Sequence, residues 1–422
     1  MIIYSIFVFD KTTPFPSLYA LIPTVGTGLL ILCAVPKTLI HNLLSLKFFV
    51  GIGLISYSAY LWHQPLLAFA RHRILGEVSD ILLIALCSIS LVLAWLSWKY
   101  IEAPFRRGKT FTRNKVFLLS IGCIFIFSSI GLSMHLKNGY EGRVSFSEEL
   151  ANSFERPSRA NCFGTPFNHS AEEWGCILGR SEGRINFILF GDSHSLSLKT
   201  LIDQRAKEKD VKVFYSGSGG CLPFIGIYLN GKDQNINNCN LLNERIFELA
   251  KSNDVDGIIL SARWSYYTYG DYGYSGGQLV SNLPEGPFSL QKSIDTFTTA
   301  LESTVDNYNS IDVPIHLITQ PPHQKYPAQS VYFRSTKRMG SVESFSVRRS
   351  DFDRLNEIPI NAFNKYESKI NIYNITDLFC DEYVCLIGER DRSFYTDDNH
   401  LGTYGALKLE KVIDNILSKE VL

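Results

Sequence analysis

Four long apolar runs in the first third of the chain constrain its fold more than any other feature. They cover residues 17–35, 48–70, 81–98 and 116–134. Each run approaches or reaches the roughly 20 residues that a helix needs to cross a bilayer core. Core helices of a soluble protein are the alternative, but four such runs in series favour membrane spans. The opening residues 1–9 are too short to span and resemble the end of a further helix.

Positive charge between the third and fourth runs predicts how the chain is oriented. This loop carries six basic residues, namely Lys99, Arg106, Arg107, Lys109, Arg113 and Lys115. Because short loops rich in Lys and Arg stay in the cytoplasm, the fourth run would deliver residues 135–422 to the outer side. Arg71 and Arg73, after the second run, fit this orientation less well.

The cysteines agree with an outer, oxidising location for the second part of the chain. Three of them lie in the apolar runs, and the other six form couples that are close in sequence: Cys162 with Cys176, Cys221 with Cys239, and Cys380 with Cys385. An even number of cysteines outside a membrane suggests disulfides. A metal site is the alternative, but neither C-x-x-C spacing nor an adjacent histidine supports one, so we expect no metal.

Residues 184–422 have the pattern of an α/β domain with a parallel sheet. Short apolar runs, predicted as strands, alternate with segments of helical spacing. The strands are expected at 185–190, 211–215, 256–260, 314–319 and 370–374, and the helices at 195–208, 240–252, 288–307, 351–367 and 403–417. We therefore predict three parts: a membrane region at 1–134, a linker and entry segment at 135–183, and this domain. Positive and negative side chains balance at 41 each, which gives no reason to expect nucleic acid.

Polar residues gather where the predicted strands end, which is the edge where parallel sheets place their chemistry. Ser193 lies in "GDSHS", at a corner between a strand and a helix. His400 precedes the last helix, and Asp397 lies three residues before it. A nucleophilic serine needs a base and a group that orients the base. Each residue alone could be a helix cap or a turn residue, but their joint placement favours a Ser–His–Asp triad.

These motifs are specific enough to indicate a family. "FGDSHS" and "DDNHLGTYGA" resemble the first and last blocks of the SGNH hydrolase superfamily, whose fold is a three-layer α/β/α sandwich. The strings "GLISYSAYLWHQPLL" and "YIEAPFR" resemble the closing helices of the acyltransferase-3 membrane family. Fusions of the two are bacterial O-acetyltransferases that modify lipopolysaccharide O-antigen and related glycans. The resemblance therefore implies a multi-pass protein of the bacterial inner membrane with a periplasmic C-terminal domain.

The resemblance also implies roles for individual residues. Ser193 would be the nucleophile, His400 its base, and Asp397 the partner of His400. The backbone N–H of Ser193, with Gly219 or Gly220, would form the oxyanion hole. The third block usually holds an Asn, but this chain has "SARWS" there, so we assign Arg263 to the oxyanion hole or to substrate binding, with a surface ion pair as the alternative.

Aromatic residues follow Arg263 and suit stacking on sugar rings. They include Trp264, Tyr266 and Tyr267, with an ordinary aromatic loop packed on the sheet as the alternative reading.

The membrane region departs from the acyltransferase-3 pattern, because that family has about ten spans and its presumed catalytic residues lie in the N-terminal ones. His63 is polar at membrane depth and could line a channel or lie near the interface. Glu102 and Arg106 are expected to form a structural pair at the cytoplasmic end. The resemblance implies acetyl-CoA as acyl donor for the complete system, no cofactor bound to this chain, and absent helices that another chain could supply.

Three functions remain open at this point. The first is acyl transfer, with acetyl as the expected group, to a cell-surface glycan from a chain embedded in the lipid bilayer. The second is a membrane-anchored periplasmic carbohydrate acetyl esterase, in which water takes the acyl group. The third is an inactive fragment of a longer acetyltransferase.

Overall fold

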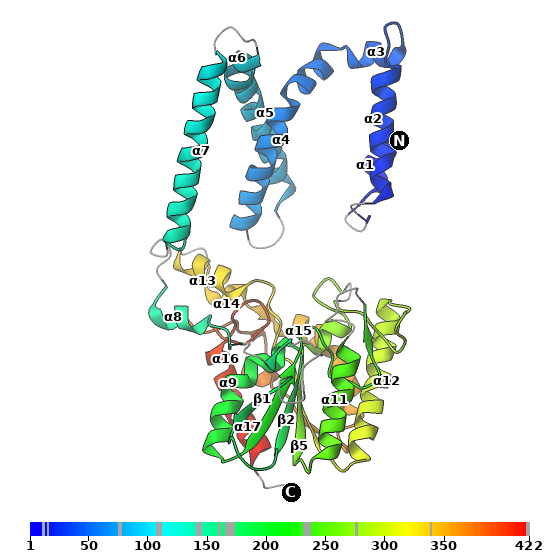
Figure 1. The fold of residues 1–422 in the computed structure, drawn as a ribbon, viewed down its shortest axis with the longest axis vertical. Helices are drawn as coiled ribbons and strands as arrows, with labels where there is room; N and C mark the ends of the chain where they lie inside the picture. Colours follow the sequence, from blue (N-terminus) through cyan, green and yellow to red (C-terminus); the bar gives the residue numbers. More distant parts are fainter. Residues whose placement is uncertain are drawn as a thin grey trace. The chain divides into compact units, whose positions relative to one another are not determined.

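The computed structural model describes residues 1–418 except 11–12, 15–16, 75–77, 107–111, 141–145, 159–161, 165–173, 231–237, 275–276 and 338–339. The chain divides into two compact units, Met1–Tyr140 and Glu141–Leu422. The first unit is helical and the second is an α/β domain (Figure 1). Parts of the basic loop, of the predicted linker and of the aromatic stretch after Arg263 lie outside the described residues.

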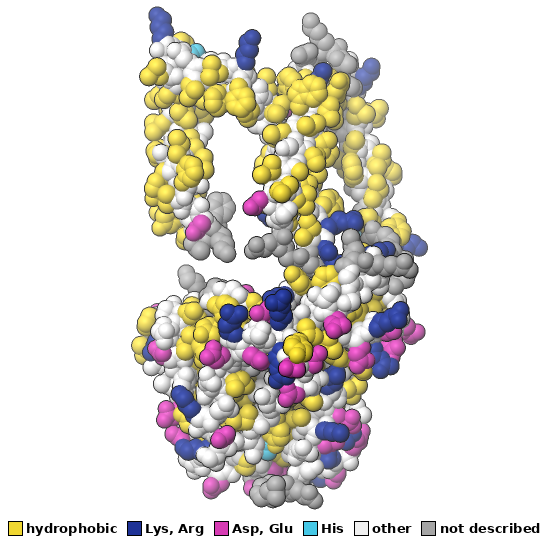
Figure 2. Space-filling model, turned by 180° about the vertical axis from the view of Figure 1, so that it is seen from behind, with side chains coloured by type: hydrophobic (Ala, Val, Ile, Leu, Met, Phe, Trp, Pro, Cys, Tyr) yellow, Lys and Arg dark blue, Asp and Glu magenta, His cyan; other side chains and the backbone are white. Residues whose placement is uncertain are grey.

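The helical unit contains two helices that are long and apolar enough to cross a membrane. One runs from α5 (Asp80–Ser97) through a π-helical turn, η2 (Trp98–Glu102), into α6 (Ala103–Arg106), and the other is α7 (Arg113–Leu136). Almost none of their side chains is buried within the structure, and hydrophobic side chains dominate the visible surface of this unit (Figure 2). Apolar helices that their own protein leaves uncovered indicate a lipid environment.

Within the described residues, the other two predicted spans form helices that are either too short or not apolar enough to cross a membrane. The first run forms only the 3₁₀ turn η1 (Leu18–Ala20) and the 13-residue α2 (Leu21–Cys33), flanked by the short α1 (Ile2–Val8) and α3 (Leu39–Leu44). The second forms α4 (Lys47–Arg73), which is long but holds serines, tyrosines and His63 that lower its hydropathy. The expectation of four spans is therefore reduced to two candidate helices.

Polar residues of the helical unit bond to one another or to their own backbone. Glu102 forms an ion pair with Arg106 at 3.1 Å, which confirms the predicted pair, and accepts a hydrogen bond from Ser58 of α4 at 3.1 Å. The Nδ1 of His63 donates to the carbonyl of Tyr60 in its own helix at 2.6 Å. Local bonding satisfies part of the polar capacity of His63, and its predicted channel-lining role stays a prediction.

The α/β unit is built on a six-stranded sheet in the order β1-β3-β2-β5-β7-β9. Its five parallel strands are those that the sequence predicted: β2 (Phe187–Gly191), β3 (Lys212–Gly217), β5 (Gly257–Ser261), β7 (Ile315–Ile318) and β9 (Asn371–Tyr373). Numbered along the chain, these strands have the order 2-1-3-4-5 of a doubly wound fold. Such folds place their ligand crevice where the strand order reverses, beside the first parallel strand.

Helices cover both faces of this sheet (Figure 1). One face carries α9 (Ser193–Glu208), α16 (Thr403–Leu407) and α17 (Glu410–Leu417), and the other carries α11 (Cys239–Ser252), α12 (Leu290–Asn309) and α15 (Arg349–Asn364). Every residue of β2 and β5 is buried, as strands between two helix layers must be. Smaller elements complete the unit, namely α8 (Glu148–Ser153), η5 (Trp264–Tyr267), α13 (Ala328–Thr336), α14 (Val342–Phe345), η6 (Thr376–Leu378), and the two-stranded ribbons β4 (Tyr228–Leu229) with β6 (Val280–Ser281) and β8 (Val347–Arg348) with β10 (Val384–Cys385).

The entry segment contains a strand that the sequence did not predict. β1 (Cys176–Gly179) pairs antiparallel with β3 at the edge of the sheet. Four residues bounded by glycines give too short a pattern to distinguish from a loop. The structure confirms the three predicted disulfides, Cys162–Cys176, Cys221–Cys239 and Cys380–Cys385. The first of them ties the entry segment to this edge strand.

Candidate active site

The turn between β2 and α9 is fixed by the buried carboxylate of Asp192. This side chain accepts hydrogen bonds from the backbone N–H of His194 at 2.8 Å, the backbone N–H of Arg263 at 3.0 Å and the hydroxyl of Tyr267 at 2.9 Å. Burial raises the pKa of Asp192, and these three donors oppose that rise. Asp192 therefore caps α9 and ties it to the end of β5, which fixes Ser193 as the first residue of the helix.

The structure brings Ser193, His400 and Asp397 together in one hydrogen-bonded chain. The Oγ of Ser193 lies 2.7 Å from Nε2 of His400, and Nδ1 of His400 lies 2.7 Å from Oδ2 of Asp397. More than 200 residues separate the serine from the other two along the chain. The order of contacts is the one required for a serine nucleophile, a base and a group that orients the base.

Asp397 is held by a turn of its own loop. Its Oδ1 accepts the backbone N–H groups of Asn399 at 3.0 Å and His400 at 2.8 Å. Burial by itself raises the pKa of Asp397, but the bond with His400, the charge of that ring and the two backbone donors outweigh it. The pKa of this carboxyl therefore lies below its usual range. Asp397 is thus ionised across the pH range in which a histidine base acts.

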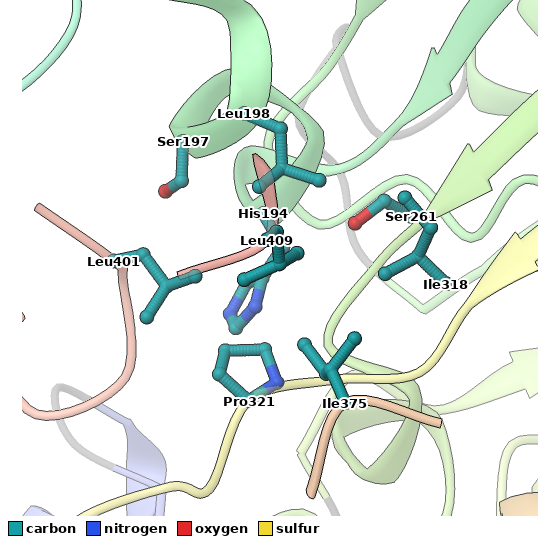
Figure 3. A pocket seen from close by; sticks show the side chains of 9 residues that line it. All are labelled: His194, Ser197, Leu198, Ser261, Ile318, Pro321, Ile375, Leu401 and Leu409. Atoms are coloured by element: carbon teal, nitrogen blue, oxygen red, sulfur yellow. The ribbon is translucent and has the colours of Figure 1, made fainter. Parts of the chain in front are cut away.

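A second histidine, His194, lies buried beneath the triad. Its ring centre is 5.1 Å from that of His400, and its Nε2 lies 3.1 Å from Oδ1 of Asn399. Burial, helped by the charge of His400, lowers the pKa of His194 well below its ordinary value. Figure 3 shows its ring pointing into a small cavity whose lining is mostly apolar, next to Pro321 and Leu409. His194 is therefore a neutral part of the support under the triad.

The residues predicted for the oxyanion hole differ in whether their backbone N–H groups already donate a hydrogen bond within the protein. The N–H groups of Gly219 and Gly220 donate no hydrogen bond to the described residues, and a side chain at either position would meet open space. Gly220 has a φ of 68°, which favours glycine. The backbone N–H of Arg263 is already bound to Asp192. The two glycines thus have free donors, and their assignment to the oxyanion hole stays a prediction.

The guanidinium of Arg263 belongs to a polar cluster that the sequence did not reveal. It donates to the carbonyl of Gly270 at 3.0 Å and to Nδ1 of His323 at 3.1 Å, and it lies over the ring of Tyr266 at 5.0 Å. Within the described part of the chain, Arg263 forms no ion pair with a carboxylate, so the alternative of a surface ion pair has no support there. His323 in turn faces Asp398 at 3.7 Å. A direct contact of Arg263 with substrate stays a prediction.

The predicted sugar-stacking role is wrong for two of the three aromatic residues. Trp264 and Tyr267 are both completely buried. Trp264 donates to the carbonyl of Ile318 at 2.9 Å and stacks on Phe224, while Tyr267 bonds to Asp192. They lie three residues apart in the 3₁₀ turn η5, and such spacing places side chains on one face. Only Tyr266 between them remains partly exposed, so it alone stays a candidate for contact with a glycan.

Among the residues that the structure describes, no group of three or more His, Cys, Asp or Glu side chains is arranged to hold a metal ion.

The fold and the residues at the carboxyl edge of its sheet define an SGNH-type α/β domain. The chain belongs to the family described as SGNH domain (fused to AT3 domains), which matches residues 161–415.

Known proteins of several kinds resemble parts of the chain. Over 73 residues it is 33% identical to the O-acetyltransferase OatA of Staphylococcus aureus and 34% identical to a putative O-acetyltransferase of the same species (strain COL). These stretches are 17% of this chain, which spans only 12% of the length of either relative.

Two solved structures are similar to part of the chain. The periplasmic domain of a lipopolysaccharide acetyltransferase from Salmonella ser. Paratyphi A has a TM-score of 0.47 at 15% identity, with 61% of this chain and 92% of that one covered. A GDSL-like lipase from Bacteroides thetaiotaomicron has a TM-score of 0.33 at 12% identity, with 56% and 89% covered.

Proposed function

We propose that the chain transfers an O-acyl group, acetyl in the first instance, to a cell-surface polysaccharide such as lipopolysaccharide O-antigen. The observation that carries this proposal is the 2.7 Å contact of Ser193 with His400, continued by the 2.7 Å contact of His400 with Asp397. Membership of a family whose SGNH domains are fused to AT3 domains supports acyl chemistry. The short matches to two proteins named as O-acetyltransferases support acetyl transfer.

The proposed reaction has two halves. In the first, Oγ of Ser193 attacks the acyl carbonyl carbon while Nε2 of His400 takes the hydroxyl proton. Collapse of the tetrahedral intermediate breaks the bond to the donor's leaving group, which receives that proton from His400. In the second half, a sugar hydroxyl gives its proton to His400 and attacks the acyl-serine. The sugar ester leaves, and Ser193 recovers its proton.

Two features of the site lower the barriers to these steps. Asp397 holds the proton on Nδ1 of His400, so that Nε2 is free to accept, and it stabilises the imidazolium that forms. Ser193 is the first residue of α9, so its N–H lies at the helix N-terminus, where backbone donors and the helix dipole favour negative charge. Together with Gly219 or Gly220, this N–H would hold the oxyanion; removal of one such donor costs roughly 100- to 1,000-fold in kcat.

The proposed location follows from the helical unit. Two apolar helices would anchor the chain in the bacterial inner membrane, with the α/β unit in the periplasm, where the three disulfides are stable. We further propose acetyl-CoA as the ultimate donor in the complete system. Acyl groups would then pass outward through acyltransferase-3 helices, some of which another chain could supply.

Ester hydrolysis is the second candidate, and one observation favours it. The side chains of His400 and Asp397 are 25% and 22% exposed, so water can reach the base. Water would then replace the sugar hydroxyl in the second half of the reaction and release acetate. The ordered triad argues against an inactive fragment.

The test uses the full chain in detergent with a chromogenic acetyl ester as donor, with and without an O-antigen oligosaccharide. We expect acetylated oligosaccharide from the wild type and none from Ser193→Ala. Ser197→Ala, which removes a hydroxyl one turn further along α9, is the matched control and should retain activity. Acetate release that is unaffected by the oligosaccharide would support the esterase. Equal activity of Ser193→Ala and wild type would refute both enzymatic functions.

A further inference from the structure

The segment that joins α7 to the SGNH domain reaches the proposed triad. Residues 147–156, here called the joining segment, precede the family match, which begins at residue 161. One of its side chains, Arg156, places Nη2 at 2.7 Å from Oδ2 of Asp397. That oxygen is the same one that Nδ1 of His400 contacts. A residue outside the matched family region therefore shares the triad carboxylate with the base.

Besides Arg156, other residues of the joining segment contact the loop that carries Asp397 and His400. Glu149 forms an ion pair with Arg392, and Oγ of Ser153 accepts the backbone N–H of Ser393 at 3.0 Å. The carbonyl of Ser153 lies so near Gly402 that a side chain there would approach it to 2.3 Å. These contacts hold the backbone of the segment in place whether or not the Arg156 side chain is present.

We propose that Arg156 is a positioning residue that sets the protonation of the triad through Asp397 and thereby couples the joining segment to activity. This inference rests on the proposed function. The guanidinium offsets part of the negative charge that stabilises a protonated His400. The base thus stays unprotonated, and able to accept the Ser193 proton, at lower pH than it would without Arg156.

Other charged or titratable groups surround Asp397 and His400, and none of them duplicates this contact among the described residues. Asp192, His194 and Asp398 interact electrostatically with Asp397 or His400, while Arg263 and His323 act on His194 and Asp398. His194 is buried and neutral, and Asp398 faces His323. Among the residues that the structure describes, only Arg156 and the ring of His400 are hydrogen-bonded to Oδ2 of Asp397. Within this described part, Arg156 is consequently the one side chain outside the triad that contacts this oxygen directly.

The experiment compares the pH profile of kcat/KM for acetyl ester hydrolysis by the full chain in detergent. For Arg156→Gln we expect the acid limb to move up by roughly 0.2–0.7 pH unit, the range that an exposed ion pair supports. Below the limb, kcat/KM then falls about 1.6- to 5-fold, since each pH unit is a factor of ten. The plateau at higher pH should be unchanged, and Arg156→Lys should restore the wild-type limb.

Arg392→Gln is the matched control. It removes the ion pair between Arg392 and Glu149, which also ties the joining segment to the loop that carries Asp397 and His400, without touching the triad. Its acid limb should coincide with that of the wild type. An equal shift in Arg392→Gln would overturn the proposal, because loss of a tether and not of charge beside Asp397 would then move the acid limb. No shift in Arg156→Gln would overturn it directly.

A second measurement does not depend on activity. The ¹³C resonance of the His400 ring, assigned with His400→Gln, is followed with pH in wild type and in Arg156→Gln. A higher midpoint in the variant supports the coupling even if the wild type hydrolyses nothing, in which case only the proposed function fails. An unchanged midpoint refutes the coupling whatever the activity.

Discussion

His194 makes the stability of the α/β unit depend on pH in a way that the structure specifies. Its side chain is buried, bonded to Asn399 and adjacent to the ring of His400. Burial and the charge of His400 lower its pKa well below the ordinary value. A group with a depressed folded-state pKa contributes stability above its unfolded value of about 6.5, and that stability is lost as the pH falls toward the folded value.

The magnitude follows from the number of protons involved. Each histidine that stays neutral when folded but is protonated when unfolded costs about 1.4 kcal/mol of unfolding free energy per pH unit in that window. Replacing His194 by Gln, which does not titrate, should remove one such contribution. From about pH 6.5, where half of the unfolded His194 is protonated, to about pH 5.5, the variant should therefore lose about 1 kcal/mol less than the wild type.

The assay is urea unfolding of the full chain in detergent, scored by pulse proteolysis of the α/β unit at several pH values. His316→Gln serves as the comparison, because burial lowers the pKa of His316 to about 4. In this variant too, the slope of the unfolding free energy against pH should fall by the contribution of one histidine. The double variant should lose two. Equal slopes for wild type and His194→Gln would refute the reasoning, since His194 would then be protonated in the folded state.

Two further predictions concern the triad and the aromatic turn. Asp397→Asn should lower kcat for acetyl ester hydrolysis by about 10⁴-fold without changing the fold, because an amide at this position can donate to Nδ1 and favour the wrong tautomer of His400. A decrease of less than about tenfold, with an unchanged circular dichroism spectrum, would contradict the role of Asp397. Trp264→Ala should destabilise the α/β unit by about 3–5 kcal/mol, since it empties a fully buried site; a variant of wild-type stability that fails only with glycan acceptors would instead restore the sugar-stacking role for Trp264.

The five parallel strands could be predicted because each is apolar on both faces. Two helix layers require that composition, and few other environments tolerate it. The position of Ser193 could be inferred for a related reason, since the chain must turn where β2 leaves the buried layer. The antiparallel strand β1 could not be predicted, because its four residues pair only with an edge already present.

The aromatic turn shows why local patterns mislead about exposure. "RWSYY" reads as a surface loop rich in rings, and nothing local says which rings face inward. The 3₁₀ turn η5 decides this by turning positions 264 and 267 into the core and leaving 266 at the surface. The membrane region gave a similar error, because α4 is long enough to span but its polar residues reduce its hydropathy.

By itself, the sequence determined the apolar first part of the chain, the α/β class of residues 184–422, the three disulfide couples and the three residues that form the proposed triad. These depend on composition and on spacing along the chain, which a sequence records directly. Only the tertiary structure decided that Asp192 anchors the turn, that Trp264 belongs to the core, and that Arg156 shares the carboxylate of Asp397. Contacts between residues 54 to 241 positions apart arise from packing, and no local pattern encodes them.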